Sequence, residues 1–296
     1  MWSTFVSAIG FGVVLASIIA VAAMGFTIQF GLTNVLNLSF GAVMTVAAFA
    51  AYLANRHGVG GWSGLVVGGA AGAVFTLALG RGIFKPYARR GAQLFEMMMV
   101  TLGLSLIVNY SVQAISHNNI YQFAVLQSTP LQFGSILITH TQLIIVFISI
   151  GVLVVLQALL RGTKIGKALR AMAADPDLAR ASGIRTGRIV VITWLLSGFL
   201  CGLAGVVYVV NAQSVGYTTG QLFLPLVIAA AILGGAGSPV GAVIASLIMG
   251  IVTEEVAAFG SEAYSTVAGF GILVLVLLSR PGTVRGGQAG HTQLTL

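Results

Sequence analysis

The chain has 296 residues, of which 57% are hydrophobic and only 7% are charged, whereas an ordinary soluble domain carries about 25% charged residues. So few charges cannot cover the surface of a soluble fold of this size, so the composition excludes a soluble globular protein and predicts an all-α polytopic membrane protein. The formal net charge of +8 comes from basic residues in short segments between apolar runs, so nucleic acid is not an expected partner, and the single cysteine, Cys201, excludes an internal disulfide.

The first apolar run has no basic residue before it, so we expect a retained first span rather than a cleaved signal peptide. A bilayer core needs roughly 20 mostly apolar residues for each helix. Several runs in this chain are shorter, so the sequence predicts about eight or nine transmembrane helices, some of them broken or re-entrant. The runs are residues 6–28, 38–54, 65–79, 95–115, 143–160, 190–210, 222–233, 240–258 and 267–278.

Basic segments set the expected orientation, because short loops rich in Lys and Arg prefer the cytoplasm. Every Lys and Arg except Arg56 falls in residues 81–90, in residues 161–188 or after residue 279. With these three segments inside, the runs give nine crossings, an N-terminus outside and a C-terminus in the cytoplasm. The stretch 116–141 then lies outside, and it carries no Lys or Arg.

Two stretches of polar and flexible residues, 29–41 and 233–241, interrupt the apolar runs. Irregular backbone at membrane depth survives only where it is buried in protein or lines a cavity, and transporters hold substrates near such breaks. The first stretch carries Asn34, Asn37 and Ser39, which we predict to line a translocation path. The alternative, that both stretches are ordinary turns at the membrane surface, stays open on the sequence.

Small residues predict close helix contacts as well. Gly68 with Gly72, and Gly198 with Gly202, have the spacing of small-xxx-small pairs. This spacing does not choose between a contact within the chain and a contact with a partner.

Residues 161–188 form the longest hydrophilic stretch, and its pattern is helical. Ile165, Leu169 and Met172 fall on one face. Asp175 and Pro176 have the order of an N-cap followed by the first helical residue, so they predict a second short helix, with Gly183 as its C-cap. The amphipathic helix could lie on anionic lipid or dock on a cytosolic partner, and spacing alone favours neither.

No motif in the sequence supplies energy or catalysis. A G-x-x-x-x-G-K-[ST] loop is absent, and the spans hold almost no ionisable residue that could relay protons, although carbonyls and hydroxyls could still hold sodium. No metal-ligand spacing and no nucleophile–base pair occurs. The pattern favours a pore worked by a separate motor, with an ion-coupled secondary carrier, a passive channel and a membrane-embedded enzyme as the alternatives.

Three stretches carry a resemblance to a known family. They read GKALRAMAADPDLARASGI at 166–184, AILGGAGSPVGAVIASLIMGI at 231–251 and FGLTNVLNLSFGAV at 30–43. Together they resemble the ATPase-docking segment, the Gly-rich late segment and the early segment of permease subunits from high-affinity branched-chain amino-acid-type ABC importers. The early segment of that family usually reads N-x-A-H-G-E, whereas this chain has Phe40, Gly41 and Ala42 in place of His-Gly-Glu. Phe40 and Gly41 therefore join the predicted path, and an altered substrate is expected.

The resemblance implies an ABC importer transmembrane-domain architecture with eight spans, one fewer than the crossing count. It implies a single permease domain over residues 1–296, with a coupling-helix loop at 161–188 and a short flexible tail at 281–296. The matched ATPase-docking positions are Gly166, Ala168, Leu169, Met172, Ala173 and Ala174.

The same resemblance implies a set of partners. These are a second related permease, two cytosolic ATPase subunits and an extracytoplasmic substrate-binding protein, in the inner membrane of a bacterium. This chain would bind no cofactor or metal itself, and ATP and Mg would bind to the ATPase subunits. The solute would be a branched-chain amino acid or a related urea, amide or carboxylate.

Overall fold

The computed structural model describes residues 2–58, 60, 62–91, 93–123, 130–133, 136–235 and 237–279. The expected tail at 281–296 lies outside the described residues. The helices are α1 (Trp2–Thr33), α2 (Phe40–Arg56), α3 (Gly64–Leu79), the π-helical turn η1 (Gly80–Phe84), α4 (Lys85–Arg89), α5 (Leu94–Ser116), α6 (His140–Gly162), α7 (Lys164–Ala174), α8 (Pro176–Ala181), α9 (Thr186–Ala212), α10 (Thr219–Leu233), α11 (Pro239–Phe259) and α12 (Glu262–Ser279).

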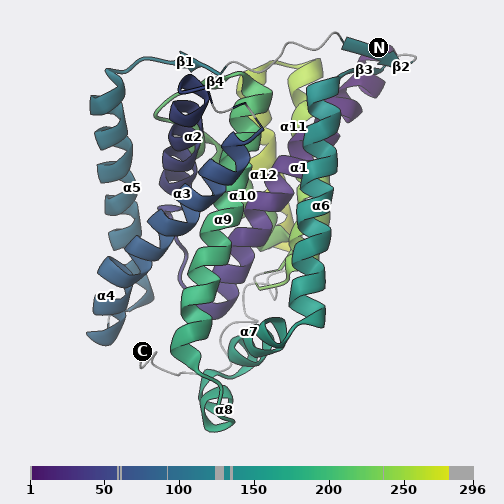
Figure 1. The fold of residues 1–296 in the computed structure, drawn as a ribbon. Coiled ribbons are helices and arrows are strands. Elements are labelled where there is room, and N and C mark those ends of the chain that lie inside the picture. The colour runs from purple at the N-terminus through teal and green to yellow at the C-terminus, as the bar shows by residue number, and fades with distance from the viewer. Residues whose placement is uncertain are drawn as a thin grey trace.

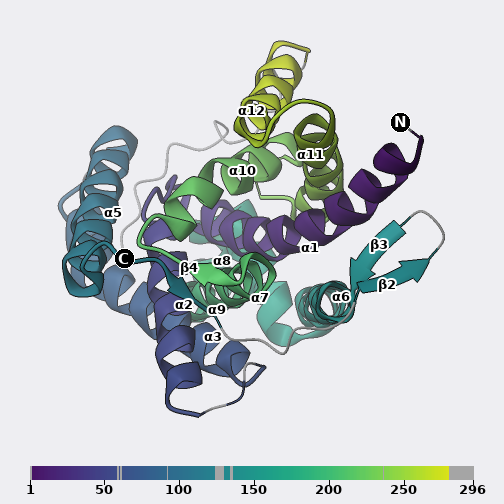
Figure 2. The same ribbon diagram turned by 90° about the horizontal axis from the view of Figure 1, so that it is seen from above.

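Helices α1 and α9 form the centre of a helical bundle, and α5, α6 and α12 lie at its periphery (Figures 1 and 2). The most apolar windows of α1 and α9 are 61% and 67% buried, against 17% for α5 and 22% for α6. Both peripheral helices are strongly apolar yet exposed, so in a bilayer their outer faces meet lipid or another subunit.

Glycines bring α3 and α9 into close contact. A Cβ atom on Gly72 would collide with the carbonyl oxygen of Gly198. A Cβ atom on Gly202 would collide with the carbonyl oxygen of Gly68. Both pairs predicted from the sequence therefore meet one another within the chain. Because the atoms in contact belong to the backbone, no change of rotamer can make room for a larger residue.

Six of the described helices are long and apolar enough to cross a membrane. They are α1, the continuous segment Gly64–Tyr87, α5, α6, α9 and α11. Helix α2 has 17 residues and α10 has 15, so α10 spans only about 22 Å at 1.5 Å per residue. The sequence-based expectation that some apolar runs are too short to span alone is therefore confirmed.

The structure corrects two predicted boundaries. Helix α1 continues to Thr33, so Phe30 and Gly31 belong to the helix and the first break covers only residues 34–39. The basic segment expected as a loop at 81–90 is mostly helical, because α3 continues through η1 into α4. A π-turn adds one residue to a helical turn without ending the helix. The helix therefore continues past Leu79, and the basic residues of this segment lie on it rather than on a loop.

Two short β-ribbons cover one end of the bundle. Strand β1 (Tyr121–Gln122) pairs antiparallel with β4 (Ser214–Val215), and β2 (Pro130–Phe133) pairs antiparallel with β3 (Ile136–Thr139). The β1–β4 pair ties the segment after α5 to the segment after α9. These strands were not predicted from the sequence.

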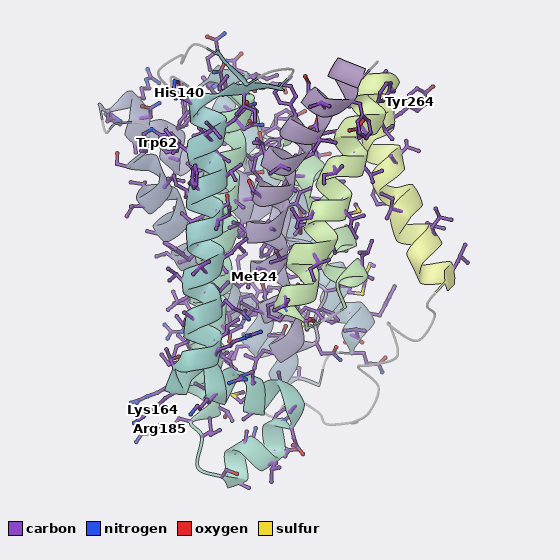
Figure 3. The ribbon with its side chains drawn as sticks, turned by 90° about the vertical axis from the view of Figure 1, so that its right-hand side faces the viewer. Met24, Trp62, His140, Lys164, Arg185 and Tyr264 are labelled. Atoms are coloured by element: carbon purple, nitrogen blue, oxygen red, sulfur yellow. The ribbon has the colours of Figure 1, made fainter. Side chains whose placement is uncertain are left out.

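The two ends of the bundle differ in composition (Figure 3). Lys164 and Arg185 lie at the end that carries α7 and α8, whereas Trp62, His140 and Tyr264 lie at the opposite end. Aromatic side chains are typical of membrane–water interfaces, and clustered basic residues are typical of the cytoplasmic side. The predicted separation of charge between the two ends is therefore present in the fold.

Candidate functional site

The break between α1 and α2 begins at the exposed Asn34 and ends inside the bundle. The carbonyl oxygen of Phe40, the first residue of α2, accepts a hydrogen bond from the Cys201 thiol at 3.2 Å. Cys201 lies about 22 Å along α9 from Thr186, at 1.5 Å per residue, which is near the middle of that helix. The irregular backbone of residues 34–39 therefore ends at the depth of the membrane core, which is the arrangement expected of a discontinuous transporter helix rather than of a surface turn.

Side chains satisfy the backbone of this first break. The Oδ1 atom of Asn37 accepts hydrogen bonds from the Ser39 backbone N–H at 3.0 Å and from the Ser39 hydroxyl at 2.6 Å. The hydroxyl oxygen of Thr101, on α5, accepts from the Leu38 N–H at 3.1 Å. Without such partners, an interrupted helix would leave polar groups stranded in an apolar interior.

One polar group at the break has no partner among the described residues. The side chain of Asn37 is only 1% exposed, and its Nδ2 amide is buried without a hydrogen-bond acceptor. A buried donor left unpaired costs about 1–3 kcal/mol. Such a group is a candidate to meet a ligand or a further subunit.

The second, glycine-rich break lies against the last turns of α1, just before the first break. A Cβ atom on Gly31 would come within 3.1 Å of the Cα atom of Gly237. Gly235 and Gly237 adopt positive φ angles of 93° and 87°, which L side chains rarely adopt. The Ser238 hydroxyl then caps α11 by accepting from the Gly241 N–H at 3.2 Å. Tertiary packing thus places the second break beside the end of α1, close to the first break although the two are far apart in the chain.

A polar stripe runs along α5 from the first break toward the aromatic end. Its buried polar residues are Thr101, Ser105, Asn109 and Ser116, while apolar side chains occupy the outer face of the helix. The Nδ2 group of Asn109 donates to the Ser105 hydroxyl and to Oε1 of Gln221 on α10, both at 3.4 Å, and its Oδ1 atom has no partner among the described residues. The stripe was not predicted from the sequence, although polar residues at every fourth position from 101 to 109 of an apolar helix were a visible signal.

The predicted path residues fall into different environments. Asn37, Ser39 and Phe40 are buried at the break. Asn34 is exposed and ends α1 with a φ of 50°, so its side chain is not gathered with theirs. Gly41 packs against the backbone of Gly220, where a Cβ atom would lie 2.6 Å from the carbonyl oxygen.

A rigid corner attaches α7 to the end of α6. The Thr163 hydroxyl donates to the Leu159 carbonyl at 2.7 Å and accepts from the Gly166 N–H at 3.1 Å. A Cβ atom on Gly166 would collide with the Leu160 carbonyl. Only glycine lets α7 fold back this closely, so Gly166 has a structural reason for its place at the corner.

The apolar stripe of α7 faces its own bundle. Leu169 and Met172 are 5% and 4% exposed, whereas Ile165 is 39% exposed and lies off the buried face. The stripe expected to face lipid or a partner is therefore used inside the chain, because the tight corner turns that face back onto α6 and α9. Of the predicted docking positions, Ala173 and Ala174 are exposed, Ala168 is partly buried and the other three are buried.

The end of α7 has the geometry predicted from the sequence. The carboxylate of Asp175 accepts from the N–H groups of Asp177 at 3.0 Å and Leu178 at 2.9 Å, and Pro176 is the first residue of α8. Gly183 follows α8 with a φ of 81°. The N-cap and the glycine stop are both confirmed, so α7 and α8 form a fixed helical pair outside the bundle.

Nothing in the described part of the chain gathers three or more His, Cys, Asp or Glu side chains as a metal ion would require. The polar groups at the two breaks are neutral amides and hydroxyls. This arrangement can hydrogen-bond to a polar solute, but it contains no pair of groups placed for acid–base chemistry.

Residues 8–277 match the family described as "Branched-chain amino acid transport system / permease component". The chain belongs to this family. The permease is 27% identical over 294 residues to the high-affinity branched-chain amino acid transport system permease protein LivH of Escherichia coli K12, which covers 93% of each chain. It is 31% identical over 295 residues to the probable branched-chain amino acid transport permease protein LivH of Methanocaldococcus jannaschii, covering 93% of this chain and 90% of that one.

More distant matches include a permease named for a sugar. The permease is 28% identical over 273 residues to the fructose import permease protein FruF of Bifidobacterium longum, covering 86% of this chain and 72% of that one. The solved structure of PsaBC from Streptococcus pneumoniae in complex with Fab has the same fold, with a TM-score of 0.51, 14% identity and coverage of 94% and 95%. The permease is therefore a transmembrane subunit of an ATP-driven ABC importer rather than a self-contained carrier or channel, and such subunits are not themselves enzymes.

Proposed function

We propose that this permease imports a small solute of the branched-chain amino-acid type and pairs with a second related permease in a bacterial inner membrane. Two cytosolic ATPase subunits would bind ATP and Mg and supply the energy, and an extracytoplasmic protein would deliver the solute. The N-terminus and the β-ribbons would lie outside, and α7 and α8 in the cytosol. The family match over residues 8–277 supports this set of partners.

The observation that carries the proposal is the fixed α7–α8 pair outside the bundle. Helix α7 is held to α6 by the Gly166 corner, and the Ile184 N–H donates to the Ala179 carbonyl at 3.1 Å where α8 leads into α9. A displacement of the pair would therefore act on two long helices at once. This is the connection that alternating access requires between a motor and a path.

The path would run along the polar stripe of α5 to the two breaks. Its groups are neutral amides and hydroxyls, including the unpaired Nδ2 of Asn37 and Oδ1 of Asn109. A solute with both donors and acceptors could pair with them, and apolar neighbours would tolerate an aliphatic side chain. These features support a zwitterion with a hydrocarbon side chain; the fructose permeases among the relatives make a sugar the second candidate.

Docking on an ATPase is tested on the exposed face of α7. In the double variant Ala173→Trp/Ala174→Trp, two bulky side chains replace exposed alanines, so ATPase subunits should no longer co-purify with the tagged permease while the permease yield holds. Asn119→Trp, at an exposed position of the opposite end, is the matched control. Normal co-purification with the α7 variant would exclude this face as the docking site.

The solute is tested with the assembled transporter in vesicles that contain the binding protein and internal ATP. We expect labelled leucine to accumulate, and unlabelled isoleucine and valine to compete with it. Accumulation of fructose but not leucine would replace the amino-acid assignment with the sugar. Uptake by the permease alone, without ATPase subunits, would overturn the proposed mechanism.

A further inference from the structure

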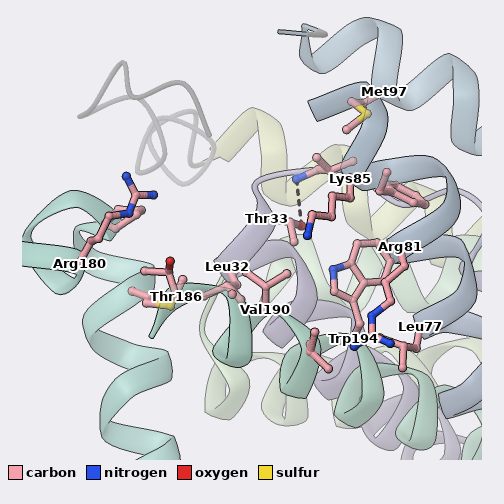
Figure 4. A pocket seen from close by; sticks show the side chains of 17 residues that line it. Leu32, Thr33, Leu77, Arg81, Lys85, Met97, Arg180, Thr186, Val190 and Trp194 are labelled. Atoms are coloured by element: carbon pink, nitrogen blue, oxygen red, sulfur yellow. Dashed lines mark hydrogen bonds between the residues drawn. The ribbon is translucent and has the colours of Figure 1, made fainter. Parts of the chain in front are cut away.

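A cavity of about 200 Å³ lies at the basic end of the bundle, among α1, η1, α4, α5 and α9 (Figure 4). Its walls are mostly apolar and include Leu32, Leu77, Phe84, Val190 and Trp194. The rings of Phe84 and Trp194 pack with their centroids 4.7 Å apart. An apolar cavity of about 150 Å³ already accommodates benzene, so this one can take up part of a hydrocarbon chain.

Two basic side chains border the cavity. Arg81 and Lys85 are four residues apart on the continuous η1–α4 segment, so they lie on the same side of it. Figure 4 shows Arg81 beside Trp194 and Lys85 near Thr33. Neither basic residue forms an ion pair with any part of the chain that the structure describes. Arg180 of α8 borders the cavity from another side and pairs with Asp177 at 3.6 Å.

The acidic side chains at this end of the bundle already have other partners. Glu96 accepts a hydrogen bond from the Gln93 N–H at 3.1 Å at the start of α5. Asp175 caps α8, and Asp177 pairs with Arg180. Within the described residues, the chain thus offers no anion to Arg81 and Lys85. The missing charge has to come from a ligand, the solvent, the membrane or a partner subunit.

The combination of a hydrocarbon-sized apolar interior with a basic border defines the ligand chemistry. A small free anion would use the two cations but not the walls, and an apolar solute would use only the walls. An amphiphile with a phosphate group and an acyl chain uses both. We propose that this cavity binds an anionic phospholipid, with the phosphate on Arg81 and Lys85 and acyl carbons against Trp194. This proposal rests on the proposed function only where it assigns the lipid to the cytoplasmic leaflet.

Photo-crosslinking of the transporter as purified from membranes, with its subunits, tests the site directly. The probe is phosphatidylglycerol with a diazirine in one acyl chain, at low mole fraction in phosphatidylcholine vesicles, and the comparison probe is phosphatidylcholine with the same label. Peptide mapping should locate adducts on η1 and on the first half of α9. The anionic probe should be favoured by about 25-fold, because each of the two basic side chains near an anionic headgroup contributes about fivefold.

Variants connect that preference to the cavity. Arg81→Ala/Lys85→Ala should bring the two probes to nearly equal yields, and Arg81→Lys/Lys85→Arg should restore the preference. Arg161→Ala/Arg188→Ala removes the same charge from the same end of the bundle outside the cavity walls, so it should leave the preference unchanged. An unchanged preference in the Arg81 and Lys85 variant, or equal labelling of the wild type by both probes, would overturn the proposal.

A competition experiment distinguishes a bound lipid from a bound soluble phosphate compound. Glycerol 3-phosphate and inorganic phosphate share the headgroup chemistry but lack an acyl chain. Millimolar amounts should not reduce labelling at Trp194 and its neighbours. Displacement of the lipid by these compounds would show a phosphate site without a lipid and would overturn the assignment. Because none of these measurements uses transport or ATP hydrolysis, their failure is distinct from a failure of the proposed function.

Discussion

The contact between Gly41 and Gly220 permits a quantitative test of how the first break is held. A Cβ atom on Gly41 would lie 2.6 Å from the Gly220 carbonyl oxygen, 3.0 Å from its carbon and 3.1 Å from the Leu224 Cβ. Two of these neighbours are backbone atoms, so they cannot move aside without moving α10. In addition, the Gly220 N–H donates to the Thr45 hydroxyl at 3.0 Å, a bond that joins α10 to α2. Gly41→Ala therefore forces the two helices apart.

The expected cost is about 2 kcal/mol. Overpacking of this kind costs about 1–3 kcal/mol, and weakening the bond to Thr45 adds about 0.5–1.5 kcal/mol. The greater helix propensity of alanine offsets at most about 1 kcal/mol. If about 1 kcal/mol shifts Tm by 2–4 °C, the substitution should lower Tm by about 4–8 °C.

Size-exclusion chromatography of detergent-solubilised permease after heating would measure this shift. The control is Gly151→Ala on α6, where no atom lies within 4 Å of the added carbon, so Tm should stay the same or rise slightly. An unchanged Tm for Gly41→Ala would refute the packing argument. An unchanged Tm together with lost uptake would instead make Gly41 a path residue, as the sequence first suggested.

Three further substitutions test the site. Asp175→Ala removes the cap of α8, so that helix should lose about 1 kcal/mol and its amides should exchange faster with deuterium; unaltered exchange would contradict the cap. Asn109→Leu should reduce uptake by at least about tenfold, or ~1.4 kcal/mol, with ATPase subunits still bound. Asn109→Gln should retain part of the uptake. Full uptake by the leucine variant would remove Asn109 from the path. Leu169→Asp buries a charge at a cost of several kcal/mol and should lower the yield of folded permease, whereas Ile165→Asp on the exposed side should not; equal yields would contradict the inward orientation of α7.

Local signals in the sequence were sufficient for much of the fold. The apolar runs located the helices, because only about 20 apolar residues in a helix suit a bilayer core. The pair Asp175 and Pro176 located the start of α8, since capping depends on neighbouring residues alone. The two glycine pairs of α3 and α9 predicted a close contact, but their spacing could not say that they meet each other.

The candidate site was only partly visible from the sequence. Asn37 and Ser39 were proposed because polar residues at an interrupted helix stand out locally, and the structure buries both. Asn109 was not proposed, since its place in the stripe depends on facing Gln221 of α10, far along the chain. The docking stripe was misoriented for the same reason: periodicity shows that Leu169 and Met172 share a face with one another but not what that face meets.

The sequence by itself therefore determined the membrane class, the helices, the capped joint at α8 and the family resemblance, because each depends on residues close together in the chain. Only the tertiary structure decided that the second break touches the end of α1 at Gly31 and Gly237, that α5 turns its polar stripe inward and that α7 packs its apolar face on α6 and α9. These contacts follow from how whole helices pack against one another. The same apolar residue satisfies lipid, a neighbouring helix or a partner subunit equally well, so the pattern of one segment cannot select among them.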